Sequence, residues 1–62
     1  MKYNELKRIL IKNGCTCEKE KANHEWWYSP LTDCYFPIGR HGKEEIATGT
    51  LKKIAKQSGL KL

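Results

Sequence analysis

The side chains best suited to chemistry in this sequence are two imidazoles and three thiols. His24 opens an aromatic stretch, His24–Ser29 (HEWWYS), and His41 lies in a basic Gly-Arg-His-Gly segment. Imidazole exchanges protons near neutral pH, because its ordinary pKa is about 6.5. It is therefore a natural general acid or base. The plainer interpretation makes His24 a surface residue at the start of a strand, and His41 a loop residue or a cap for the following helix.

The three cysteines raise the question of a zinc site. Cys15, Cys17 and Cys34, together with one histidine, would supply four ligands. The spacing argues against zinc, since Cys-x-Cys is not the usual zinc knuckle and the alternating pattern turns Cys15 and Cys17 toward the core. We interpret the cysteines as small hydrophobic residues and expect neither a metal nor a cofactor.

Length and charge limit the class of protein. The 62 residues predict one domain, 1–62, whose core contributes only roughly 3–5 kcal/mol. No apolar run approaches the ~20 residues of a membrane span, and the charged N-terminal stretch lacks the apolar centre of a signal peptide. We expect a cytoplasmic protein with reduced thiols and no membrane partner. The formal net charge of +5 favours nucleic acid as a partner, although charge of this size also serves solubility alone.

Two helices are predicted by apolar residues that recur every three or four positions. The first covers residues 4–13, and the second closes the chain with its lysines on the solvent side. Each helix has recognisable start and stop signals. The predicted caps and stops are Asn4 and Gly14 for the first helix, and Thr48 or Thr50 and Gly59 for the second.

Three strands lie between these helices, beginning at Cys15, over His24–Ser29 and over Cys34–Ile38. Pro37 cannot donate to a ladder, which places the last strand at an edge. The order predicts an α+β fold, α-β-β-β-α, with a three-stranded antiparallel sheet and both helices on one face. Strand periodicity then divides the side chains between the two faces. The inward set is Trp27, Phe36 and Ile38, and the outward set is His24, Trp26, Tyr28 and Tyr35.

The sequence also resembles a known family along nearly its whole length. The resemblance includes a first helix ending at Gly14, an aromatic strand ending at Pro30 and an Arg-His turn. Its most specific parts are the start of the last helix, Gly49-Thr50-Leu51, and its end, Lys56-Gln57-Ser58-Gly59-Leu60. On these residues the chain is similar to the HicA toxins, small mRNA interferases of HicA–HicB toxin–antitoxin systems. Their fold is similar to a double-stranded-RNA-binding domain.

The resemblance implies a catalytic residue. His24 falls on the first histidine of a family motif that usually reads Gly-Ser-His-His, and this is the family's catalytic histidine. Here Ala22 and Asn23 stand in place of Gly and Ser, Glu25 replaces the second His, and Gly39 replaces a common Pro. Asn23 tolerates the left-handed backbone region that a glycine would adopt. Glu25 is expected to place a negative charge beside a site that holds phosphate.

The implied activity is cleavage of mRNA without a metal. His24, as general acid/base, would take the ribose 2′-OH proton so that the oxygen attacks its own phosphodiester. Nearby cations would stabilise the charged phosphate, and aromatic rings would stack splayed bases. His41 is the available candidate for a second proton-transfer group. The residues expected to bind RNA are Lys21, Asn23, Trp26, Tyr28, Arg40 and Lys43.

Three functions remain open at this point. The first is the endoribonuclease toxin, neutralised by a HicB-type antitoxin that covers His24. The second is a non-catalytic RNA-binding module of the same fold, which holds structured RNA by shape and phosphate contacts. The third is an interaction protein whose bare aromatic sheet face docks a partner.

Overall fold

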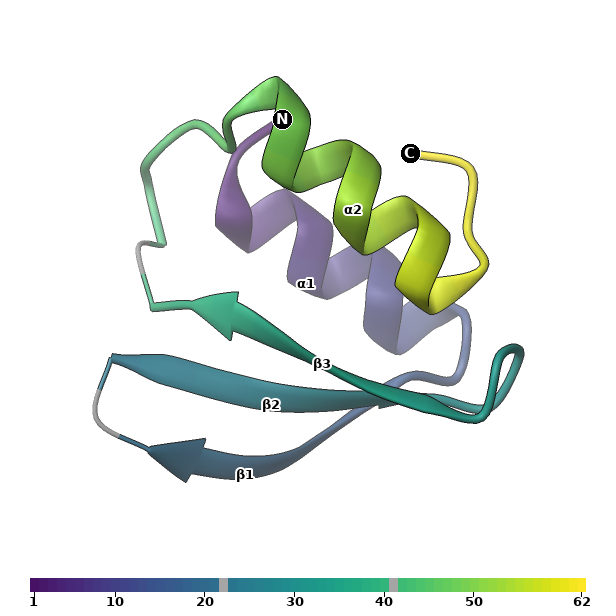
Figure 1. Ribbon diagram of the computed structural model, residues 1–62. Coiled ribbons are helices and arrows are strands. Elements are labelled where there is room, and N and C mark those ends of the chain that lie inside the picture. Colours follow the sequence, from purple (N-terminus) through teal and green to yellow (C-terminus); the bar gives the residue numbers. More distant parts are fainter. Residues whose placement is uncertain (22, 41) are drawn as a thin grey trace.

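The computed structural model contains two helices and three strands in the predicted order. It describes residues 1–21, 23–40 and 42–62, so the expectations for Ala22 and His41 lie outside the described residues. The strands form an antiparallel sheet of order β1-β2-β3, and both helices cover one face of it (Figure 1). This arrangement confirms the predicted α+β fold and agrees with that of a double-stranded-RNA-binding domain. The elements are α1 (Tyr3–Lys12), β1 (Thr16–Lys21), β2 (His24–Ser29), β3 (Cys34–Gly39) and α2 (Thr48–Ser58).

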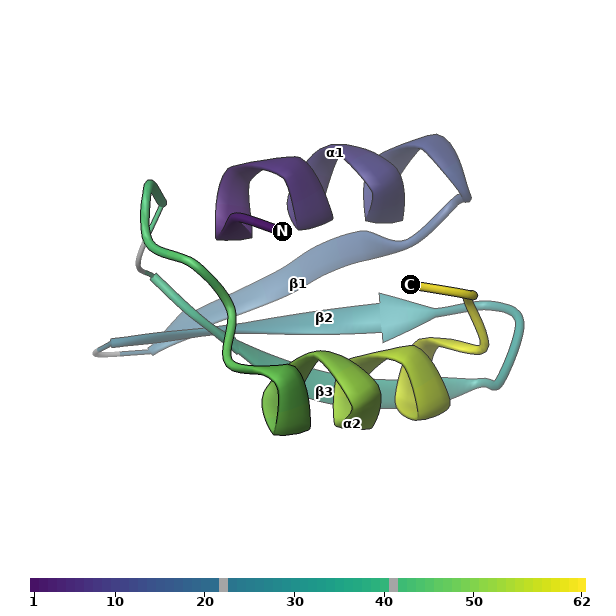
Figure 2. The ribbon, with the colours of Figure 1, turned by 90° about the horizontal axis from the view of Figure 1, so that it is seen from above.

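The two helices lie side by side and run in the same direction as β2 (Figures 1 and 2). Viewed from above, α1 lies on the β1 side of the sheet and α2 on the β3 side (Figure 2). The starts of both helices and the start of β2 therefore lie at one end of the molecule. The opposite sheet face carries no helix, and we call it the open face.

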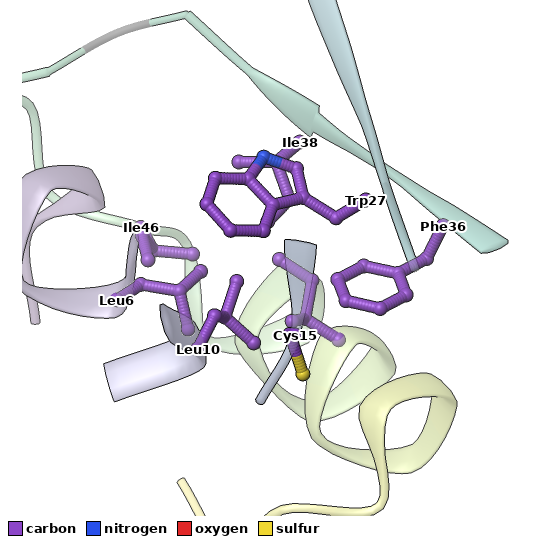
Figure 3. Packing of buried hydrophobic residues seen from close by; sticks show 8 residues of the cluster. Leu6, Leu10, Cys15, Trp27, Phe36, Ile38 and Ile46 are labelled. Carbon is purple, nitrogen blue, oxygen red and sulfur yellow. The ribbon is translucent and has the colours of Figure 1, made fainter. Parts of the chain in front are cut away.

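The core lies between the helices and the sheet. Leu6 and Leu10 of α1 point toward the sheet residues Trp27, Phe36 and Ile38 (Figure 3). These three sheet residues are at most 3% exposed, which confirms the predicted inward set. Buried side chains of this size each contribute about 1.5–3 kcal/mol. The cluster is completed by Cys15, Ile46 and Ile54.

The helix starts differ from the prediction. The N-cap residues are Lys2 and Ala47, and neither makes a side-chain capping bond, so the predicted caps Asn4 and Thr48 or Thr50 are wrong. In α1 the loop before α2 supplies the acceptors instead. The Asn4 N–H donates to the Gly42 carbonyl at 3.0 Å, and the Tyr3 N–H donates to the Glu44 carbonyl at 3.2 Å. Backbone carbonyls thus take the place of a side-chain cap.

The helix stops are confirmed. Gly14 and Gly59 have φ of +87° and +77°, the left-handed conformation that glycine adopts without steric cost. The Cys15 N–H donates back to the Leu10 carbonyl at 2.9 Å, and the Gly59 N–H to the Ala55 carbonyl at 3.0 Å. Both helices therefore end where the sequence predicted.

The first strand differs from the prediction at one thiol. The register of β1 shifts between Cys17 and Lys19, which makes a β-bulge, and every residue of β1 is exposed. Cys17 pairs with Trp27 and so lies on the helix side of the sheet, but it is exposed at the edge. The expectation that Cys15 and Cys17 are both buried is right for Cys15, which is 2% exposed, and wrong for Cys17.

Candidate active site

The register of the sheet determines which side chains surround His24 on the open face. Directly paired residues on neighbouring strands share a face, and residues two apart on one strand do as well. His24, Trp26 and Tyr28 of β2 therefore form the centre of three rows that cross the open face. The rows are Lys21–His24–Gly39, Lys19–Trp26–Pro37 and Thr16–Tyr28–Tyr35.

The first row brings a cation to His24. Lys21 and His24 are both exposed and are direct partners, and such pairs have Cα atoms roughly 4.5–5.5 Å apart. On the other side of His24, Arg40 follows Gly39, and the Arg40 N–H donates to the Asn23 carbonyl at 3.2 Å. Three of the predicted site residues, Lys21, Asn23 and Arg40, therefore lie with His24 at one end of the sheet.

The aromatic residues are not equivalent. The Trp26 side chain is accessible, with the residue 37% exposed. The Tyr28 hydroxyl donates to Asp33 Oδ1 at 2.5 Å, and this hydrogen bond raises the pKa of Tyr28. The Tyr28 ring also packs against Tyr35, with centroids 5.1 Å apart and planes tilted by 52°. Tyr35, which is not among the predicted RNA-binding residues, is 61% exposed and offers more free surface than Tyr28.

Two hollows meet on this face at Trp26 and Tyr35. The first, of ≈ 490 Å³, lies on the β1 side, where Lys19, Lys21 and Glu18 bound it. The second, of ≈ 510 Å³, begins at His24 and Trp26 and passes over β3 to α2. His24 therefore lies beside a recess large enough to hold a nucleotide-sized group.

Glu25 does not lie where we expected it. It is on the helix side of the sheet, opposite to His24, and its side chain is 13% exposed. Its Oε1 accepts a hydrogen bond from Trp27 Nε1 at 3.0 Å and lies 3.2 Å from Lys7 Nζ. The expectation that Glu25 adds negative charge to the phosphate site is therefore wrong, because its charge is paired with α1 behind the sheet.

The remaining candidates are not joined to this site. Lys43 is exposed in the loop anchored to the start of α1, and no hydrogen bond or ion pair within the described ranges links it to His24. His41 lies outside the described residues. Cys17 and Cys34 are exposed on β1 and β3, at opposite edges of the sheet, whereas Cys15 is buried. In the part of the chain that the structure describes, no three potential metal ligands come together.

The fold and the open face define a small basic α+β domain of the double-stranded-RNA-binding type. The family described as HicA toxin of bacterial toxin-antitoxin matches residues 3–60, and the chain belongs to this family. It is accordingly a toxin of a toxin–antitoxin system, whose partner is an antitoxin. Neither the curated proteins nor the solved structures contain a significant match to it. No helix within the described residues is long and apolar enough to cross a membrane.

Proposed function

We propose that this chain is a metal-independent endoribonuclease that cleaves mRNA with His24 as its general acid/base. The observation that supports it is the position of His24 in a chain of the HicA family. The histidine is exposed on a sheet face that no helix covers, between Lys21 and Gly39 and next to Trp26 along the same face. A proton-transfer group must be open to substrate and near a cation, and His24 meets both conditions.

In the proposed reaction, the neutral imidazole of His24 takes the proton of a ribose 2′-OH. The 2′-oxygen attacks the adjacent phosphorus and the bond to the 5′-oxygen of the next nucleotide breaks. The leaving 5′-oxygen takes a proton from water, so that a 2′,3′-cyclic phosphate and a 5′-hydroxyl remain, and His24 returns its proton to solvent. Negative charge grows on the phosphate oxygens during this step, and the Lys21 ammonium and the Arg40 guanidinium are the cations best placed to stabilise it. Trp26 would hold an unstacked base and leave the backbone free to reach an in-line geometry.

We further propose that the antitoxin is of the HicB type and covers the open face around His24. The helix face of the sheet is already occupied by α1 and α2, so the open face is the large accessible surface next to the site (Figure 1). A surface with Lys19, Lys21 and Arg40 around an aromatic centre suits an acidic partner. Blocking His24 sterically would neutralise the toxin without any change in its fold.

Growth after induced expression and cleavage of purified RNA in the presence of a chelator test the proposal together. We expect arrest and cleavage by the wild type, and loss of both in His24→Ala and His24→Gln. General acid/base catalysis contributes about 10²–10⁴-fold, so residual cleavage should fall by that factor. The melting temperature should change little because His24 is exposed. Co-expression of the antitoxin, which we expect a neighbouring gene to encode, should restore growth.

Two outcomes would contradict the proposal. Unchanged cleavage by a folded His24→Ala variant would remove His24 from the chemistry. Absence of cleavage by the wild type, with RNA binding intact, would favour the non-catalytic RNA-binding module instead. His41→Ala is measured in parallel, and a separate loss of activity there would identify the second proton-transfer group.

A further inference from the structure

The two hollows of the open face form one path that continues from the sheet onto α2. They share Trp26 and Tyr35. On the β1 side the path is bordered by lysines, because Lys19 and Lys21 are the direct partners of Trp26 and His24. This side of the path is therefore suited to phosphate groups.

On the β3 side the path is bordered by Tyr35 and by two residues with short or no side chains. The β3 partners of Trp26 and His24 are Pro37 and Gly39, neither of which has a long side chain. The second hollow therefore crosses β3 and reaches α2, where Thr50, Lys53 and Gln57 line it. These three residues are spaced by three and four positions, so they lie on one face of the helix.

We propose that this path is a binding track for single-stranded RNA, with a base stacked on Trp26 and Tyr35 and a backbone phosphate held by Lys53 on α2. The inference rests on the proposed function and deepens it, because it names the strandedness of the substrate and the side from which the strand leaves His24. Thr50 and Gln57 supply hydrogen-bond donors and acceptors beside the lysine.

The chemistry of the path favours a single strand over a duplex. Stacking on an aromatic side chain needs an exposed base face, which a duplex does not offer. An RNA strand carries a negative charge on every phosphate. Such a strand can contact the ammonium groups at both ends of the path, those of Lys19 and Lys21 at one end and that of Lys53 at the other. Glu18 also borders the first hollow, where its Oε2 accepts a hydrogen bond from Thr16 Oγ1 at 2.7 Å, so the phosphate contacts on this side are assigned to Lys19 and Lys21.

The test separates binding from cleavage by using RNA whose riboses are 2′-O-methylated, so that the attacking hydroxyl is blocked. Affinity is measured for one such single strand and for a hairpin duplex of the same composition, over a range of salt concentrations. Lys53→Ala is compared with Lys52→Ala and Lys56→Ala, which remove the same charge from exposed positions of α2 outside the hollow. Trp26→Ala and Tyr35→Ala test the stacking surface.

We expect the single strand to bind more tightly than the hairpin, and Trp26→Ala to weaken it about ten-fold or more. Lys53→Ala should reduce the slope of log affinity against log salt by about 0.7, the value for one phosphate contact on a single strand, while the control lysines leave the slope unchanged. All three lysine variants should melt like the wild type.

Equal effects of Lys53→Ala and Lys52→Ala, tighter binding of the hairpin, or no binding of the single strand would each overturn the track. Unchanged RNA affinity in Lys53→Ala, Trp26→Ala and Tyr35→Ala would also overturn it. If these variants at the same time lost binding to the antitoxin, the path would be assigned to a protein partner. The proposed cleavage has a separate readout, since unmodified RNA is cut or left intact whatever these affinities are. If the wild type cleaves RNA but Lys53→Ala leaves the RNA affinity unchanged, the track is refuted and the proposed cleavage is not.

Discussion

Replacing Glu25 with histidine would restore the usual second histidine of the HicA motif, yet the structure predicts a loss of stability and no gain in activity. Glu25 faces α1, where its Oε1 accepts from Trp27 Nε1 at 3.0 Å and pairs with Lys7 Nζ at 3.2 Å. An imidazole at this position would lose the carboxylate acceptor and, when protonated, would repel Lys7. It would still lie on the opposite side of the sheet from His24.

The size of the expected loss of stability follows from how deeply the Lys7–Glu25 ion pair is buried. Hydrogen bonds to charged groups contribute about 1.5–3 kcal/mol. Exposed ion pairs contribute about 0–1 kcal/mol, whereas breaking a buried pair costs about 3–5 kcal/mol. The side chains of Lys7 and Glu25 are 20% and 13% exposed, so this pair lies between the two cases. We expect Glu25→His to lower the free energy of unfolding by about 2 kcal/mol, and the melting temperature by about 10 °C in a domain of this size.

Thermal and urea unfolding, followed by circular dichroism, measure this change. Glu20→Gln is the matched control, because Glu20 is the direct β1 partner of Glu25 but is exposed. Removing its charge relieves a repulsion between like charges and should leave stability unchanged or slightly higher. A double-mutant cycle of Lys7→Met with Glu25→Gln should give a coupling energy of about 1 kcal/mol. An unchanged melting temperature in Glu25→His, or faster RNA cleavage by it, would refute the position assigned to Glu25.

Two further predictions concern the helix ends and a thiol. Gly59→Ala should lower the free energy of unfolding by about 1–2 kcal/mol, because φ is +77° and an added Cβ would lie 2.9 Å from Thr32 Cγ2. Gly49→Ala, with open space around its added Cβ, should instead raise the free energy of unfolding by about 0.5 kcal/mol. Equal melting temperatures for the two variants would contradict this prediction. Partial desolvation of the thiol at the exposed sheet edge first, and then the charges of Glu25 and Glu20, raise the pKa of Cys17, while Lys7 lowers it. Its thiolate should therefore form, and react with iodoacetamide, only at a higher pH than an ordinary thiol. In a Cys34→Ser background, Glu25→Gln should lower the midpoint pH of this reaction and Lys7→Met should raise it, and the opposite shifts would show that Cys17 does not face this pair.

Much of the fold could be predicted because its signals are local. The apolar spacing gave both helices to within a residue or two, and Gly14 and Gly59 marked their ends through a backbone conformation that other residues adopt at a cost. Alternation along β2 and β3 correctly separated the buried Trp27 and Phe36 from the open face. The start of α1 was mispredicted, since its acceptors come from a loop about forty residues away in the chain, and the start of α2 has no side-chain cap.

The candidate site was only partly predictable, because contacts between residues that are distant in the chain leave no local signal in the sequence. The sequence by itself determined the family, and it indicated both the candidate histidine, His24, and the sheet face on which His24 lies. Tertiary structure decided which residues surround it, because strand register and helix packing join residues that are distant in the chain. The pairing of Lys21 and Gly39 with His24, the ion pair of Glu25 with Lys7, and the approach of Lys53 to the sheet all depend on that packing. Local periodicity determines which side a residue faces, and only the assembled fold determines what it meets there.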